Sequence, residues 1–107
     1  MKIPRETEIR NYELTCLVDP ELSKAELEAV NNSIQEIITK SKGKIVETED
    51  WGKKELAYVI RQTGKRYTEA QYLHFVFKAT PKQSIQVKEA INIAEPVIRY
   101  LLVKQED

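Results

Sequence analysis

The sequence predicts an α+β fold in which two helices cover one face of a four-stranded antiparallel sheet. Two observations predict it. Several segments alternate between apolar and polar residues, as half-buried strands do, and two capping boxes are each followed by apolar residues at helical spacing. These segments follow the order β-α-β-β-α-β. With 107 residues, of which 41% are hydrophobic, the chain is sized for a single domain with one core.

The first strand is expected over residues 11–18. Tyr12, Leu14, Cys16 and Val18 alternate with other residues at the two-residue period of a strand with one buried face. Pro20 follows, and proline removes a backbone donor that a continuing strand would need. The strand is therefore predicted to end before it.

The first helix has a complete start signal. Ser23 can accept from the amide of Glu26, and the Glu26 side chain can reach back to the Ser23 amide, which is the pattern of a capping box. Apolar residues at helical spacing then form one stripe: Leu27, Val30, Ile34, Ile37 and Ile38. Gly43 is predicted to end the helix by adopting the left-handed conformation at C′.

Two long strands are expected next. Residues 44–60 form an extended stretch with a bulge or bend at Gly52, residues 61–65 form a hairpin loop, and residues 66–79 form the third strand. The third strand has two distinct faces. One face carries Leu73, Phe75, Phe77 and Ala79, and the other carries Tyr72, His74 and Val76.

The second helix is predicted from a capping box of Thr80 and Gln83, with Pro81 at the first helical position, where its missing N–H has no cost. It runs to about Ile93. Its inward residues are Val87, Ala90, Ile91 and Ala94. Residues 97–104 form a last strand that is apolar on both faces except at Arg99. The whole order is that of a ferredoxin-like sandwich, a fold that hosts many functions.

The expected domain organisation is simple. Residues 1–9 form an N-terminal extension that could be flexible, residues 10–104 form the single ferredoxin-like domain, and residues 105–107 form a short acidic tail. No apolar run approaches the roughly 20 residues of a membrane helix, and the first residues lack the apolar stretch of a secretory signal. A cytosolic protein that binds no membrane is the expectation.

The composition argues against an enzyme. The single cysteine and single histidine exclude an internal disulfide and leave no pair at metal-ligand spacing. Cys16 is expected to be a small core residue, and His74 a strand residue at an interface or partly exposed, so catalysis through His74 is a remote alternative. No phosphate-binding glycine motif is present. The sequence therefore predicts no catalytic residue, no metal ligand, no cofactor and no small-molecule substrate.

The charge is balanced overall but unevenly distributed. The chain has 17 basic and 17 acidic residues, yet residues 51–107 carry 10 basic against 6 acidic side chains. Most of this excess lies in segment 51–66. Its cations are Lys53, Lys54, Arg61, Lys65 and Arg66, against the single acid Glu55. Such a stripe suits phosphate contact, but on charge alone a solvated strand edge protected by lysines is favoured.

Residues 52–61, Gly-Lys-Lys-Glu-Leu-Ala-Tyr-Val-Ile-Arg, resemble the signature of the bacterial small-subunit ribosomal protein S six (S6) family. Further segments fit the same family, in the right order: Tyr12-Glu13-Leu14, Val18-Asp19-Pro20-Glu21-Leu22, Gly43-Lys44-Ile45-Val46, Asp50-Trp51-Gly52, Val97-Ile98-Arg99-Tyr100-Leu101 and Val103-Lys104. The resemblance spans about residues 10 to 104. Three features depart from the family pattern: the residues before Arg10 are extra, Val59 replaces the usual proline, and the second helix is one residue short.

The resemblance implies a structural RNA-binding protein of the small ribosomal subunit, located in the cytoplasm, without catalytic activity or cofactor. It further implies binding to the central domain of 16S rRNA as a heterodimer with ribosomal protein S eighteen (S18). Such a partner can bring much of the cationic surface, which fits the neutral charge of this chain. With the resemblance, RNA contact becomes the favoured interpretation of the basic stripe.

Candidate binding residues follow at two places. Contacts to phosphate or to the partner are expected from Lys53, Lys54, Arg61, Arg66 and Arg99, with Arg10 and Lys104 as weaker candidates. Apolar residues expected on the partner face are Leu17, Val97, Leu101 and Val103. Trp51 is expected to be a core lid rather than part of the interface, and Tyr58 is open between packing and contact.

One alternative function stays open at this point. A non-ribosomal regulatory module of the same topology could dimerise through the uncovered face of its sheet. The apolar last strand would suit such a dimer, although no glycine-rich ligand loop accompanies it.

Overall fold

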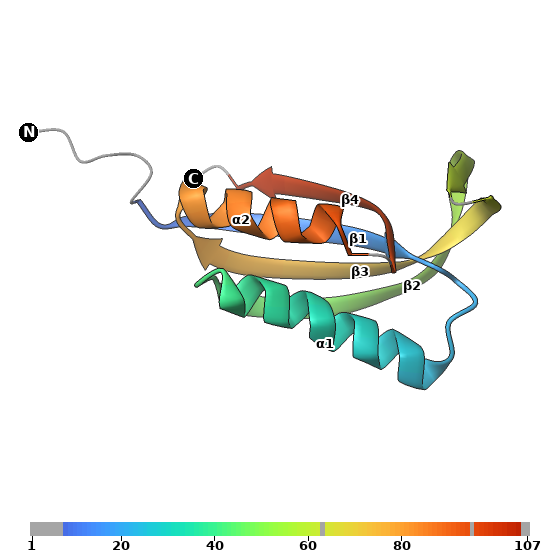
Figure 1. The fold of residues 1–107 in the computed structure, drawn as a ribbon, viewed down its shortest axis with the longest axis horizontal. Coiled ribbons are helices and arrows are strands. Elements are labelled where there is room, and N and C mark those ends of the chain that lie inside the picture. The colour runs from blue at the N-terminus through green and yellow to red at the C-terminus, as the bar shows by residue number, and fades with distance from the viewer. Residues whose placement is uncertain (1–7, 63, 95, 106–107) are drawn as a thin grey trace, which may run out of the picture.

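The computed structural model describes residues 8–62, 64–94 and 96–105, and it confirms the ferredoxin-like sandwich (Figure 1). The elements follow the predicted order: β1 (Arg10–Val18), α1 (Lys24–Lys40), β2 (Lys44–Gln62), β3 (Lys65–Ala79), α2 (Pro81–Asn92) and β4 (Val97–Lys104). Most of the predicted N-terminal extension and of the acidic tail lies outside the described residues.

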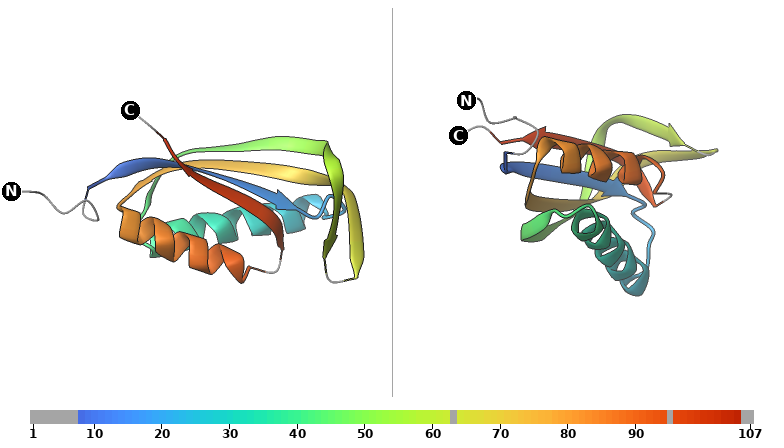
Figure 2. Two further views of the ribbon diagram at one scale, coloured as in Figure 1. Left: turned by 90° about the horizontal axis from the view of Figure 1, so that it is seen from above. Right: turned by 60° about the vertical axis from the view of Figure 1, so that its left-hand side comes forward.

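The four strands form one antiparallel sheet in the order β2-β3-β1-β4. Both helices lie on the same side of this sheet, as the left view of Figure 2 shows, and the other side is left uncovered. The described part of the chain therefore has one sheet face that forms the core and one that the helices leave uncovered.

The hydrophobic core lies between the sheet and the helices. The residues that the two-residue and helical periods predict to face inward are its centre. Among those with at most 1% exposure are Leu14, Cys16, Val18, Ile34, Ile38, Leu73, Phe75, Phe77, Val87 and Ile91. Burial raises the pKa of the Cys16 thiol to about 12, so this cysteine is a small core residue that stays protonated.

Both helices begin at the predicted capping boxes. The Ser23 hydroxyl accepts from the Glu26 amide at 3.1 Å, and the Glu26 carboxylate accepts from the Ser23 amide at 2.9 Å. Thr80 and Gln83 form the same reciprocal pair at 3.2 and 2.9 Å. These bonds satisfy amides that the first helical turn leaves without partners.

The prediction for Gly43 was wrong. The left-handed position after α1 is occupied by Lys42, with φ of 72°. Gly43 instead lies against the helix that it follows: a Cβ there would stand 2.9 Å from Ile38 Cγ2 and 3.0 Å from the Ile38 carbonyl oxygen. Glycine is therefore required here because a side chain would overlap Ile38, and not because of the backbone conformation.

Strands β2 and β3 extend beyond the rest of the sheet as a long hairpin. The last residue of β1, Val18, pairs with Gln71, so the hairpin has no third strand beyond that point. The strands continue to Gln62 and from Lys65, so the turn is shorter than the predicted 61–65 loop. The hairpin bends sharply toward the side of the sheet that carries the helices (Figure 2, left).

Two of the three register shifts between β2 and β3 accompany this shape. One lies at the predicted bulge, where Gly52 has φ of 80°. The other is larger: Glu55 pairs with Glu69 and Ile60 pairs with Tyr67, so residues 56–59 of β2 stand opposite Thr68 alone. Extra residues on one strand bend a hairpin and strengthen its twist.

No helix in the described residues is long and apolar enough to cross a membrane.

Candidate functional site

The uncovered sheet face carries exposed apolar residues on β4. Arg99 and Leu101 pair with Leu17 and Thr15 of β1, which places them on the face away from the helices. Leu101 is 63% exposed and Val103 43% exposed, and Leu17 lies partly buried beside them. We call Leu17, Leu101 and Val103 the β4 patch.

Val97 does not belong to this patch, and its predicted place on the partner face was wrong. It pairs with Val18 and is 7% exposed within the hydrophobic core. A register shift between Leu17 and Val18 separates it from the residues that follow in β4. The alternation of the last strand alone could not reveal this shift, because the strand is apolar on both faces.

A stacked pair of rings lies in the middle of the uncovered face. The Trp51 ring stacks on His74 with 4.3 Å between ring centroids, and His74 is only 6% exposed beneath it. His74 also shares a hydrogen bond of 2.9 Å with Thr15 Oγ1, and its Nε2 lies 3.3 Å from Glu13 Oε1. His74 is therefore buried, not partly exposed, and Trp51 lies over the uncovered face instead of over the core.

Lys54 lies next to this pair. Its Nζ is 5.2 Å from the Trp51 ring centroid and 5.5 Å from that of Tyr72, within the range of cation–π attraction. Lys53, one position earlier, is exposed and pairs with Gln71 in the ladder. The two predicted lysines thus point to different surroundings.

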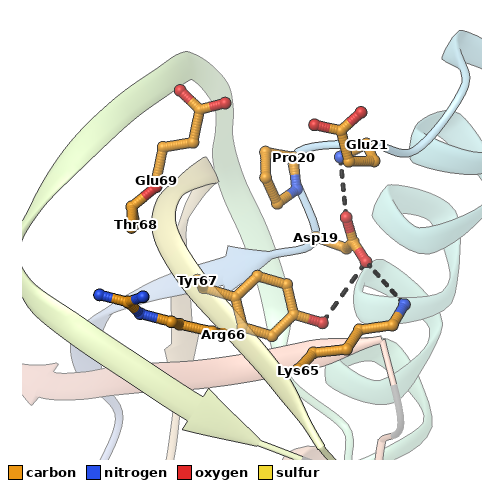
Figure 3. Close-up of a pocket in the computed structure, with 8 residues that line it drawn as sticks. All are labelled: Asp19, Pro20, Glu21, Lys65, Arg66, Tyr67, Thr68 and Glu69. Atoms are coloured by element: carbon orange, nitrogen blue, oxygen red, sulfur yellow. Dashed lines mark hydrogen bonds and ion pairs between the residues drawn. The ribbon is translucent and has the colours of Figure 1, made fainter.

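The outer end of the hairpin presents two arginines. Arg61 and Arg66 pair directly across the two strands and are both exposed. The neighbouring side chains of β3 point the other way: Lys65 Nζ lies 3.6 Å from Asp19 Oδ2, and Tyr67 Oη donates to the same oxygen at 3.4 Å (Figure 3). Figure 3 shows Arg66 directed away from Asp19.

Arg99 connects the sheet to this hairpin. Its Nη1 donates to Gln62 Oε1 at 2.7 Å and to the Ile98 carbonyl at 2.9 Å. Arg99 is therefore bonded to the hairpin, a contact that the sequence did not predict.

The predicted cations fall into two groups. Lys53, Lys54, Arg61, Arg66 and Arg99 lie toward the hairpin end of the sheet. Arg10 pairs with Ala79 and Lys104 with Tyr12 at the opposite end, and Arg10 forms an ion pair with Glu8. The structure thus brings the first group to one end and leaves the two weaker candidates apart.

Sequence reasoning missed the exposed bulge at residues 56–59, which lies between Lys54 and Arg61 within the first group. Tyr58 is 73% exposed and Val59 37% exposed, where alternation predicted an ordinary strand. This favours contact over packing for Tyr58. The register, which depends on the partner strand, was the missing information.

The described residues show no group of three or more histidine, cysteine or acidic side chains that could hold a metal ion. The side chains brought together on the hairpin and the uncovered face are instead cations, exposed aromatic residues and the apolar β4 patch. Such a set can bind phosphates and a protein surface.

The comparisons with known proteins point in the same direction. The family model described as "Ribosomal protein S6" matches residues 11–104. A curated relative, small ribosomal subunit protein bS6 of Moorella thermoacetica, is 32% identical over 92% of this chain and 97% of its own length. The corresponding protein of Campylobacter curvus is 33% identical over 92% of this chain and 67% of its own.

The fold is shared with a solved structure. The crystal structure of 30S ribosomal protein S6 from Thermotoga maritima matches with a TM-score of 0.81 and 22% identity, over 92% of this chain and 89% of that one. The chain therefore belongs to the ribosomal protein S6 family, whose members are structural, non-enzymatic proteins of the small ribosomal subunit.

Proposed function

We propose that this chain binds the central domain of 16S rRNA as a heterodimer with S18, and so supports assembly of the small ribosomal subunit in the cytoplasm. In this proposal the hairpin end of the sheet contacts RNA, and the uncovered face contacts the protein partner. The observation that carries it is the separation of these surfaces: paired arginines on the hairpin and exposed apolar residues on β4.

The hairpin has the properties of a phosphate-binding element. Arg61 and Arg66 lie side by side and are exposed, and Lys53 and Lys54 lie earlier in β2, the strand of Arg61. Arginine can bind phosphate with two parallel hydrogen bonds, and lysine acts as a point charge. Tyr58 adds an exposed aromatic ring at the bulge between them.

The β4 patch has the properties of a protein interface. Leu101 and Val103 are exposed, and Trp51 adds aromatic surface on the same face. Exposed apolar and aromatic side chains on one face of a small domain are typical of partner contact. Family membership favours the ribosomal partner over the dimeric regulatory module that the sequence left open.

The test is reconstitution from purified components. The chain, S18 and a transcript of the 16S central domain are mixed, and complexes are measured by size exclusion and by filter binding. We expect a one-to-one protein pair that retains the central-domain transcript and not a transcript of another 16S domain. Failure to form the pair, or equal retention of both transcripts, would contradict the proposal.

A further inference from the structure

We propose that Asp19 is a positioning residue for RNA binding, whose carboxylate holds the hairpin in the bend that presents Arg61 and Arg66. The inference rests on the proposed function, because it explains how the cations of that function are placed. Asp19 lies between β1 and α1, and Tyr67 stands 48 residues later in the chain. Their contact is therefore a long-range tie between the hairpin and the body of the domain.

The hairpin needs such a tie. Beyond Gln71 it consists of β2 and β3 alone, and two-stranded hairpins are marginally stable in water. The bulge at residues 56–59 also interrupts its ladder. Contacts with the rest of the domain must therefore determine the direction in which the hairpin end points.

Asp19 supplies these contacts from an oriented carboxylate. Its Oδ1 accepts from the Glu21 amide at 2.8 Å, which fixes the side chain in its own loop. Its Oδ2 accepts from Tyr67 Oη at 3.4 Å and faces Lys65 Nζ at 3.6 Å (Figure 3). The Asp19 side chain is 21% exposed but that of Lys65 is 67% exposed, so solvent screens the ion pair and the tie rests mainly on the hydrogen bond from Tyr67.

Because side chains alternate along a strand, the contacts of Asp19 also determine which way the arginines point. Lys65 and Tyr67 face Asp19, so Arg66 between them must face outward, together with its ladder partner Arg61. On the other strand, Gln62 accepts from Arg99 at 2.7 Å, and Ile60 is 4% exposed. Both strands of the hairpin end are thus held on their inner side.

A hairpin released from Asp19 would spend part of its time in other orientations. The apparent affinity for RNA then falls in proportion to the binding-competent fraction. The bound complex would still make the same phosphate contacts, so the dependence of affinity on salt should stay the same. Loss of an arginine would have a different effect, because it would lower both the affinity for RNA and the salt slope.

The test compares Asp19→Asn with Glu21→Gln in the complete S18 heterodimer bound to the 16S central-domain transcript. Both changes remove one negative charge from the same loop, and simple electrostatics predicts tighter RNA binding for both. The side-chain amide introduced by Asp19→Asn would keep an oxygen that can accept from the Glu21 amide. We expect Asp19→Asn to weaken binding about fivefold with an unchanged salt slope, and Glu21→Gln to leave binding equal or tighter.

Tyr67→Phe removes only the hydroxyl and should weaken binding in the same direction. Hydrogen exchange gives a second readout in the protein without RNA. Amides of residues 60–62 and 64–67 should exchange faster in Asp19→Asn and Tyr67→Phe, whereas those of β1 should not change.

Three results would overturn the inference: unchanged exchange in both variants, faster exchange with unchanged RNA affinity, or tightening by Asp19→Asn equal to that by Glu21→Gln. Failure of the proposed function would look different. Normal RNA binding by the Arg61→Ala/Arg66→Ala variant would remove the hairpin from the RNA site, whereas hydrogen exchange would still report whether Asp19 holds the bend.

Discussion

Two neighbouring residues end helix α1 by different means. Lys42 adopts the left-handed conformation at C′, which glycine favours and which a side chain makes less stable. Gly43 allows close contact with Ile38. The sequence shows a glycine near the end of the helix but not which of the two roles it has, because the distance to Ile38 depends on the fold.

Substitutions at these residues should have opposite effects. Lys42→Gly should raise the free energy of unfolding by about 0.5–1 kcal/mol, because glycine adopts positive φ without strain. Gly43→Ala should lower it by about 1–3 kcal/mol, because the new methyl group overlaps Ile38. Urea denaturation measures both. Destabilisation by Lys42→Gly together with tolerance of Gly43→Ala would show that the roles are reversed.

Cys16 makes the stability of the fold depend on alkaline pH. Its thiol pKa is about 12 in the folded protein, above the ordinary value of 9.0, because burial disfavours the thiolate. Above pH 9 the unfolded chain loses this proton and the folded chain keeps it. The Cys16 contribution is therefore complete below about pH 9 and is lost progressively between about pH 9 and 12.

We therefore expect wild type to lose about 1.4 kcal/mol more stability than Cys16→Ala between pH 8 and pH 10. Urea denaturation at both pH values measures the difference, and the variant serves as the control for other groups that titrate. Equal losses in the two proteins would show that the folded thiol ionises normally.

At the scale of elements, the capping boxes were fully predictable and the hairpin was not. Ser23 with Glu26, and Thr80 with Gln83, act within four residues, so the sequence contains all the information. The bend at residues 56–59 depends on the register between two strands, and the direction of the hairpin depends on Asp19. Interactions across the chain are not visible in a local pattern.

The first capping box should contribute measurably and with a defined pH dependence. Ser23→Ala should lower the free energy of unfolding by about 1 kcal/mol at pH 7. The hydrogen bond from the Ser23 amide lowers the pKa of Glu26. A lowered folded-state pKa gives stability that is present above the ordinary pKa of glutamate and is lost as the pH falls through the folded value.

The stability difference between wild type and Glu26→Gln should therefore be larger at pH 7 than at pH 3. Thermal or urea denaturation at the two values measures it. A difference that grows on acidification would contradict the assigned hydrogen bond.

At the scale of the whole molecule, one face of the sheet stabilises the fold and the other is available for binding. One sheet face is covered by both helices and forms the core, and the other carries the β4 patch and the stacked Trp51 and His74. The fold and most of the core were predictable, because periodicity identifies which residues point inward. The membership of the binding surfaces was predictable only in part: Val97 was misassigned because a register shift precedes it.

Leu101→Asp should affect binding to the protein partner without affecting the fold. A carboxylate at a buried contact should weaken binding to S18 more than tenfold, because it would lose its hydration there. The fold should remain, since this side chain is 63% exposed. Co-purification and circular dichroism measure the two effects. Ile93→Asp is the matched control, because Ile93 is 82% exposed and follows α2, away from the patch. Intact pairing of Leu101→Asp would place the partner elsewhere.

The central claim is that the hairpin end binds rRNA while the uncovered face binds the protein partner. The most direct test is the salt dependence of central-domain binding by the S18 heterodimer carrying Arg61→Ala and Arg66→Ala. We predict weaker binding and a salt slope smaller by about two units, one for each phosphate contact, with an intact protein pair. Unchanged affinity and slope across the salt series would contradict the claim.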